Sequence, residues 1–245
     1  LPVQRPQLLG DVFLPEAARK MIRDSGAELV IVIPDGPLHK LPLETLVLGT
    51  DKGPRYLLEE LPPVVYAPSS GILAYLVDRP RPQNEALSLL TVGNPEYPQA
   101  EPGTKVATTR SATSFVIGFR GQLPLLEGSL HETEVVSKFF PNRAAMLTGK
   151  AATEKAVVNA MRDKQVIHIA AHGFADDRFG NKFGALALTP PSKVESADND
   201  GFLSLHEIYD LPLEKCELAV LSACQPNVGP QPPLESGATL ANGLR

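Results

Sequence analysis

Five short apolar segments place the strongest constraint on how this chain folds. Each is apolar on both faces, which is typical of strands buried inside a parallel sheet. Helical patterns lie between them, and strands that alternate with helices predict an α/β fold with helices on both faces of a mostly parallel sheet. The expected strands are residues 29–33, 87–92, 166–171, 185–188 and 218–223, and the expected helices are residues 15–25, 131–140, 153–162 and 205–211.

Composition fits a chain that buries a core and has no nucleic-acid surface. Hydrophobic residues make up 43% of the 245 residues, which is ordinary for a globular domain. The 23 Lys and Arg residues are outnumbered by 28 Asp and Glu residues, so the net charge is −5. A phosphate-binding surface normally carries a basic excess, so we expect no direct nucleic-acid binding. The apolar runs are shorter than the roughly 18 residues of a membrane span, so we expect no membrane segment.

The two cysteines of the chain are too far apart to form a disulfide with each other. Cys216 precedes and Cys224 follows the expected strand at 218–223. An extended segment of that length spans about 26 Å, whereas a disulfide needs Cα atoms within about 7 Å. We therefore expect free thiols and a reducing, cytoplasmic setting. Cys216 stands just before the strand, where no catalytic pattern accompanies it in the sequence, and we interpret it as structural.

Two of the expected strands lead into residues that can carry chemistry. The strand at 166–171 is followed by His172 and Gly173. The strand at 218–223 is followed by Cys224. Catalytic groups gather beyond the carboxyl ends of strands in open α/β sheets, so parallel neighbours would place these residues at one edge. A thiolate can then attack a carbonyl while an imidazole accepts and returns the proton. Gly173 lacks a Cβ, so its N–H can approach an oxyanion closely.

Six stretches that span nearly the whole chain carry a family resemblance. They are LVIVIPDGPLHKLPLETL (29–46), LLTVGNPEY (89–97), LTGKAATEKAV (147–157), VIHIAAHGFAD (166–176), DGFLSLHEIYDLPL (200–213) and LAVLSACQ (218–225). At these residues the sequence resembles the CHAT-domain family of the caspase-like cysteine peptidases. The resemblance implies a caspase-hemoglobinase fold and the activity of a cysteine endopeptidase.

The resemblance also implies roles for single residues. Carried over position by position, Cys224 is the nucleophile, His172 is the catalytic histidine and Gly173 lies at the oxyanion position. The implied partners are a protein substrate and a regulatory region or sensor, commonly TPR-like, that is absent from this chain. No metal or organic cofactor is implied. The alternative interpretation is a non-catalytic caspase-like module that binds a partner or scaffolds an assembly.

The sequence departs from the family pattern after the nucleophile. The pattern continues beyond Cys224 into a helix and further strands, whereas this sequence stops at Arg245 as that helix should begin. We therefore expect a single domain over residues 1–245 that lacks its C-terminal part. Within it we expect an N-terminal subregion at about 1–85 and a catalytic core at about 86–245.

Residues close to the predicted dyad bear on substrate preference. Asp176 and Asp177 follow the histidine loop, where they either line the cleft and favour a basic substrate side chain or form a solvated acidic loop. Gln225, directly after the nucleophile, is a third candidate for substrate binding. Some basic-specific relatives carry an acidic residue two positions before the nucleophile. Ser222 stands there in this chain and leaves the preference open.

The spacing between His168 and His172 resembles that of two metal ligands. His168 lies four residues before His172, which is a metal-ligand spacing on a helix. On a strand, however, four residues span about 13 Å. We therefore expect no metal site there, and we expect His168 to pack or to form a hydrogen bond within the sheet.

Overall fold

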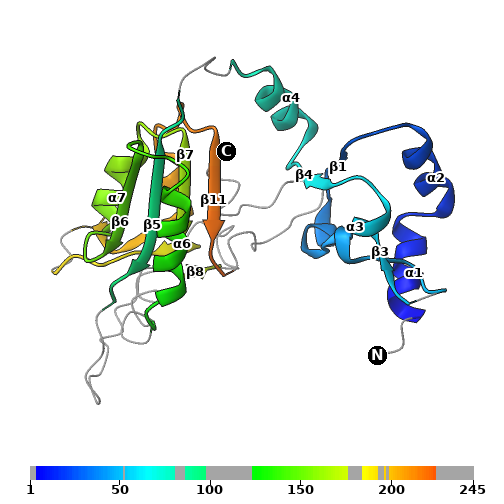
Figure 1. Cartoon of the computed structure of the whole chain (residues 1–245), viewed down its shortest axis with the longest axis horizontal. Coiled ribbons are helices and arrows are strands. Elements are labelled where there is room, and N and C mark those ends of the chain that lie inside the picture. Colours follow the sequence, from blue (N-terminus) through cyan, green and yellow to red (C-terminus); the bar gives the residue numbers. More distant parts are fainter. Residues whose placement is uncertain are drawn as a thin grey trace. The chain divides into compact units, whose positions relative to one another are not determined.

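The structure, a computed structural model, describes residues 4–51, 53–80, 86–97, 123–175, 184–192, 196 and 199–224. These residues form two compact units, and the division between the units lies between Arg79 and Pro80 (Figure 1). Each unit has buried hydrophobic clusters of its own. The proposed dyad belongs to the second unit.

The described part of the first unit combines short helices with two small sheets. Its elements are α1 (Gln4–Phe13), α2 (Glu16–Asp24), β1 (Val30–Val32), the 3₁₀ helices η1 (Gly36–Lys40) and η2 (Leu43–Thr45), β2 (Val47–Gly49), β3 (Arg55–Tyr56), α3 (Leu57–Glu60), β4 (Val64–Tyr66) and α4 (Ser70–Asp78). The strands β1 and β4 run parallel, and the strands β2 and β3 run antiparallel. Buried leucines of β2 and α3, and those directly after η2 and α3, form the centre of the unit's core.

Two predictions fall in the first unit, and one of them needs a correction. The helix predicted at 15–25 is present as α2, and Gly26 ends it with a left-handed φ of 67°. The strand predicted at 29–33 is present as β1. It is not buried on both faces, because it belongs to a two-stranded sheet that leaves Ile31 45% exposed.

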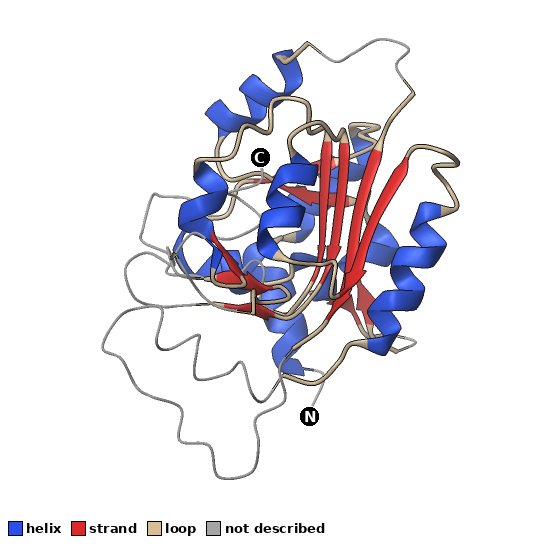
Figure 2. Cartoon of the chain, turned by 90° about the vertical axis from the view of Figure 1, so that its left-hand side faces the viewer, coloured by secondary structure: helices blue, strands red, loops and turns tan. Residues whose placement is uncertain are grey.

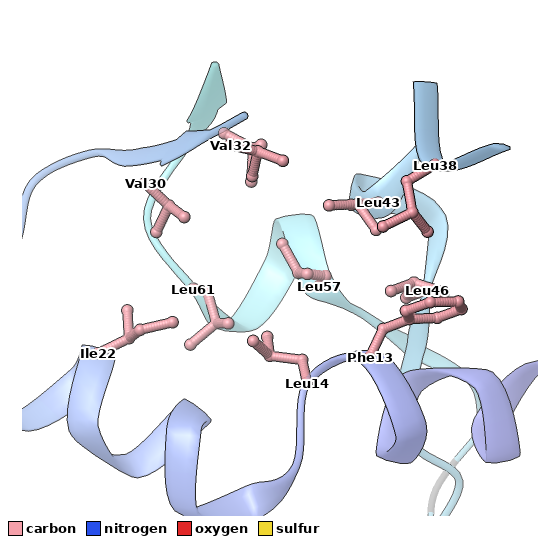
Figure 3. A pocket seen from close by; sticks show the side chains of 11 residues that line it. Phe13, Leu14, Ile22, Val30, Val32, Leu38, Leu43, Leu46, Leu57 and Leu61 are labelled. Atoms are coloured by element: carbon pink, nitrogen blue, oxygen red, sulfur yellow. The ribbon is translucent and has the colours of Figure 1, made fainter. Parts of the chain in front are cut away.

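An apolar pocket of about 140 Å³ lies inside the first unit (Figure 3). The lining side chains come from the ends of α1 and α2, from β1 and β4, and from the segment between η1 and Leu61. They are Phe13, Leu14, Ile22, Val30, Val32, Leu38, Leu43, Leu46, Leu57, Leu61 and Val64. Hydrocarbon side chains can neither transfer a proton nor act as nucleophiles, so this pocket is not a catalytic centre.

The second unit is built on a parallel sheet. Its elements are β5 (Leu89–Pro95), α6 (Glu127–Ser137), β6 (Ala144–Gly149), α7 (Glu154–Met161), β7 (Val166–Ala170), β8 (Gly173–Phe174), β9 (Ala185–Ala187), β10 (Phe202–Ser204), α8 (Leu205–Tyr209) and β11 (Leu218–Ser222). Four of the strands form one sheet in the order β11-β7-β5-β6, and all three pairings are parallel (Figure 2). This confirms the predicted α/β class with a parallel sheet.

Helices cover both faces of this sheet, as predicted. On one face, side chains of α7 and α8 join those of β5, β7 and β11 in the main hydrophobic cluster. Helix α6 packs on the opposite face, where a Cβ added to Gly93 of β5 would lie 2.5 Å from Thr133 of α6. The absence of a side chain at Gly93 therefore allows the helix to approach the strand closely.

The ends of α6 and α7 show how local sequence sets the helices. Thr153 caps α7 because its hydroxyl accepts a hydrogen bond from the Ala156 N–H at 3.3 Å, as expected for an N-cap residue. Helix α6 begins four residues earlier than the predicted range of 131–140. There the side chain of Asn94, beyond the middle of β5, accepts a hydrogen bond from the Leu126 N–H at 3.0 Å. This tertiary contact is not visible in the local sequence.

Two of the predicted strands differ from a buried parallel strand. The segment 185–188 contains β9, which pairs antiparallel with both β8 and β10 in a separate three-stranded sheet. The segment 218–223 contains β11, which is parallel but lies at the edge of the four-stranded sheet among the described strands. Its exposure alternates along the strand, and Leu218 is 53% exposed.

Candidate active site

The two residues predicted to form a dyad follow neighbouring strands. The parallel pairing of β7 with β11 ends where Ala170 lies opposite Ser222. His172 and Cys224 each stand two residues beyond that last pair. The strands β6 and β7 follow β5 in the chain but pair with it on opposite sides. The direction in which successive strands are added to the sheet therefore reverses at β5. Such a reversal is where open α/β sheets bind ligands.

Gly173 brings the two segments into direct contact. A Cβ built on Gly173 would lie 2.4 Å from the carbonyl oxygen of Cys224 and 3.1 Å from the Cβ of Ala223. Real Cβ atoms do not approach a backbone oxygen that closely. The position therefore needs glycine for a packing reason, and the oxyanion role that the sequence suggested stays a prediction.

The imidazole of His172 is held through one nitrogen. Its Nε2 lies 3.0 Å from the carbonyl oxygen of Pro124, three residues before α6 begins. A carbonyl oxygen only accepts hydrogen bonds, so Nε2 carries the proton in this contact. In the neutral ring Nδ1 then has no proton and can accept one. The backbone contact thus selects the tautomer that a general base needs.

Tyr97, just beyond β5, packs against the same imidazole. The ring centroids of Tyr97 and His172 lie 5.6 Å apart with the planes tilted by 51°. The Tyr97 hydroxyl donates a hydrogen bond to the Ala187 carbonyl at 3.0 Å. The Ala187 N–H in turn donates to the carbonyl of His172 at 2.8 Å. Burial raises the pKa of Tyr97 above its ordinary value of 10.0, so the hydroxyl keeps its proton at neutral pH. These contacts hold the histidine through both its ring and its backbone.

The two cysteines occupy different environments. Cys224 is exposed and its thiol is free. Cys216 is buried in the main hydrophobic cluster, where it packs as a small residue. A reagent or substrate in solution can therefore reach Cys224, whereas Cys216 is shielded.

His168 lies within the sheet and forms hydrogen bonds, as predicted. One ring nitrogen, Nδ1, lies 3.5 Å from the hydroxyl of Thr91 on β5. The other, Nε2, lies 3.0 Å from Oε1 of Glu132 on α6. The described residues contain no group of three or more His, Cys, Asp or Glu side chains that is placed to hold a metal ion.

The structure describes some of the predicted site residues but not all of them. Asp176, Asp177 and Gln225 lie outside the described residues, so their substrate contacts stay predictions. Two contacts of the histidine were missed by sequence reasoning. A backbone carbonyl such as that of Pro124 leaves no signal in a sequence, whereas Tyr97 was visible as the last residue of the NPEY stretch.

A second polar cluster lies at the start of α7. Glu154 is 1% exposed, and its Oε2 accepts a hydrogen bond from the Gly201 N–H at 2.7 Å. Burial, followed by repulsion from the carboxylate of Glu207 and more weakly from that of Asp200, raises its pKa from 4.5 to about 8. Glu154 is therefore protonated in the folded chain near pH 7.

Replacing Glu154 with glutamine is expected to flatten the pH dependence of stability. Because the folded-state pKa is raised, the stability contribution of Glu154 is complete below pH 4.5 and is lost as pH rises through about 8. In the wild type, this group lowers the free energy of unfolding by up to about 1.4 kcal/mol per pH unit across that window. The amide of Glu154→Gln cannot ionise, so the variant should lose this slope.

Urea unfolding at pH 5.5, 6.5 and 7.5 measures the difference between wild type and Glu154→Gln. The control is Glu134→Gln, which removes an exposed carboxylate from α6 and should keep the slope of the wild type. Parallel pH profiles for wild type and Glu154→Gln would show that Glu154 ionises normally in the folded chain.

Comparisons with known proteins add a family assignment. The family model of the CHAT domain matches residues 5–244. No curated protein matches the chain. None of the helices in the described parts of the chain is long and apolar enough to cross a membrane.

Proposed function

Because the chain belongs to the CHAT domain family, which is caspase-like, we propose that it is a cysteine endopeptidase with Cys224 as nucleophile and His172 as general base. One observation supports this most directly. The ends of two paired parallel strands bring the backbone of Cys224 against Gly173, the residue that follows His172. An exposed thiol and an imidazole of fixed tautomer thus emerge from neighbouring strand ends.

The proposed reaction proceeds through an acyl-enzyme. Nε2 of His172 is engaged with Pro124, so Nδ1 takes the proton from the thiol of Cys224. The thiolate attacks the carbonyl carbon of the scissile peptide, and a tetrahedral oxyanion forms. When the C–N bond breaks, His172 gives its proton to the departing amine and a thioester remains. Water then attacks the thioester, its proton passes to His172, and cleavage of the C–S bond releases the carboxyl product.

Stabilisation of the oxyanion is assigned to the backbone at Gly173. A backbone N–H close to the nucleophile can donate a hydrogen bond to the oxygen as negative charge develops on it. The close packing of Gly173 on the backbone of Cys224 supports this assignment, because it keeps the two residues at a fixed separation.

The wider proposal extends to the fold and to control of the site. We assign the caspase-hemoglobinase type to the α/β unit on the basis of the family match and the parallel sheet. The substrate is a protein, and a sensor or repeat region outside this chain controls access to the site. Asp176, Asp177 and Gln225 are the proposed substrate contacts.

A peptide-library assay tests the proposed function. The chain is incubated with a library of peptides at neutral pH, and new chain ends are identified by mass spectrometry. We expect cleavage that stops when Cys224 is alkylated with iodoacetamide, with the adduct mapped to the peptide that contains Cys224. Chelation of metals should leave cleavage unchanged. Cleavage that survives complete alkylation of Cys224 would exclude the cysteine mechanism, and no cleavage with a folded chain would favour the non-catalytic module.

A further inference from the structure

A chain of polar side chains crosses the sheet face that α6 covers, next to the proposed dyad. Glu132 of α6 accepts a hydrogen bond from the hydroxyl of Ser222 on β11 at 3.1 Å. The other oxygen of the same carboxylate lies 3.0 Å from Nε2 of His168 on β7. One carboxylate thus contacts both strands that lead to the proposed catalytic residues. Ser222 stands two residues before Cys224, and His168 stands four residues before His172.

The strand β11 has few other side-chain contacts on this face. Side chains alternate between the two faces of a strand, so Leu218, Val220 and Ser222 share the face that α6 covers. Leu218 is 53% and Val220 is 38% exposed. The alternate residues Ala219 and Leu221 pack into the main cluster on the opposite face. Among the described residues, the hydrogen bond of Ser222 is the side-chain hydrogen bond that joins β11 to α6.

The position of this bond is what matters for Cys224. The backbone pairing of β11 with β7 ends at Ser222, so Cys224 lies past the last paired residue. Gly173 limits how far the Cys224 backbone can move toward the histidine segment. The Ser222 hydroxyl ties the strand end to α6. A strand end that is held by both contacts keeps its next side chain in a defined place.

Glu132 is well suited to act as the anchor. Its carboxylate is 37% exposed, but its histidine partner is buried, with a side chain that is 7% exposed. A carboxylate that accepts two hydrogen bonds is a strong acceptor with a restricted rotamer. Moreover, the helix that carries Glu132 begins three residues after Pro124, whose carbonyl holds His172. The segment just before the helix therefore contacts His172, and the second turn of the helix contacts Ser222, two residues before Cys224.

We propose that Glu132 is a positioning residue that holds the end of β11, and with it Cys224, in place through Ser222. The inference rests on the proposed function, because it assigns to Glu132 the alignment of Cys224 with His172. Glu132 does not touch the substrate in this proposal. Removal of either hydrogen-bonding partner should let the strand end drift and weaken the proton transfer from Cys224 to His172.

Alkylation of Cys224 by iodoacetamide at two pH values provides the test, and it needs no substrate. At pH 9.5 most free thiols are ionised, so the rate reports access to the sulfur. At pH 6.5 the rate depends on help from His172. We expect Ser222→Ala and Glu132→Ala to lower the rate at pH 6.5 by about five- to tenfold, and to leave the rate at pH 9.5 unchanged. The rates are followed by mass spectrometry of the peptide that contains Cys224.

Two further variants distinguish positioning from a general effect. Glu132→Gln keeps one carbonyl oxygen as an acceptor and should restore part of the rate at pH 6.5. Glu134→Gln removes an exposed carboxylate two residues along the same helix and should behave as the wild type. Thermal melting of each variant checks folding. Ser222 is exposed, so Ser222→Ala should remain folded even if Glu132→Ala does not.

The outcomes separate the inference from the proposed function. His172→Ala should lose the rate at pH 6.5 and retain it at pH 9.5. If His172→Ala shows this pattern while Ser222→Ala matches the wild type, the proposed role of Glu132 is wrong and the proposed dyad of Cys224 and His172 is retained. If His172→Ala itself matches the wild type at pH 6.5, the dyad is wrong. Equal losses at both pH values in Ser222→Ala would show altered access to Cys224 and would also overturn the positioning role.

Discussion

Cys224→Ala is expected to lower peptide cleavage by at least about a thousandfold, because no covalent acyl-enzyme can form without the sulfur. The fold should not change. Cys224 is exposed, so its truncation leaves no cavity in the core. The measurement is kcat/KM on a peptide taken from the library assay, with the thermal melting point of the variant recorded beside it.

The matched control for this loss is Cys216→Ala. Cys216 is buried in the main hydrophobic cluster, so its replacement should cost about 1 kcal/mol of stability through lost packing. Its activity should remain within a few-fold of the wild type. Cys224→Ala should therefore lose activity and keep its stability, whereas Cys216→Ala should lose some stability and keep its activity. Residual cleavage by Cys224→Ala, after contamination by wild-type protein is excluded, would contradict a cysteine nucleophile.

The parallel core of the fold could be predicted because its strands are marked by continuous apolar residues. β7 is buried throughout, β5 is buried except at Asn94, and both have few polar residues. By contrast, β6 was not predicted. Its residues Ala144–Gly149 include two alanines and a glycine, which have low strand propensity, and the strand forms because β5 offers it a parallel partner.

The direction and burial of the strands were harder to predict from the sequence than their existence. The antiparallel pairing of β9 depends on β8 and β10, of two and three residues, which are too short to give a periodic signal. The exposure of β11 depends on its place at the edge of the described sheet, which no residue within the strand encodes. In both cases the deciding information is the identity of the neighbour.

The candidate site was predictable where chemistry depends on the residue type, and less so where it depends on contacts. His172 and Cys224 could be selected because a histidine and a cysteine each follow an apolar strand. Glu132 could not be distinguished in advance from Glu134, since both are acidic residues of one helix. Only the packing of α6 on the sheet turns Glu132 toward His168 and leaves Glu134 exposed.

Gly173→Ala should reduce cleavage by about a hundredfold or more, although it adds a single methyl group. The added Cβ would lie 2.4 Å from the carbonyl oxygen of Cys224. Neither atom belongs to a flexible side chain, so the two backbone segments must separate. Overpacking of this kind costs about 1–3 kcal/mol of stability. The variant keeps the N–H of residue 173, so its loss of activity would come from the displaced alignment of Cys224 and His172.

The control is Gly128→Ala in the first turns of α6, which makes the same chemical change without the clash. A Cβ at Gly128 meets no atom within 4 Å, and alanine favours a helix over glycine by about 1 kcal/mol. Gly128→Ala should therefore keep its activity and gain stability. Equal activity for both variants would show that the contact between Gly173 and Cys224 does not set the catalytic geometry. A selective loss in Gly173→Ala would show that this contact sets the spacing between the nucleophile and its base.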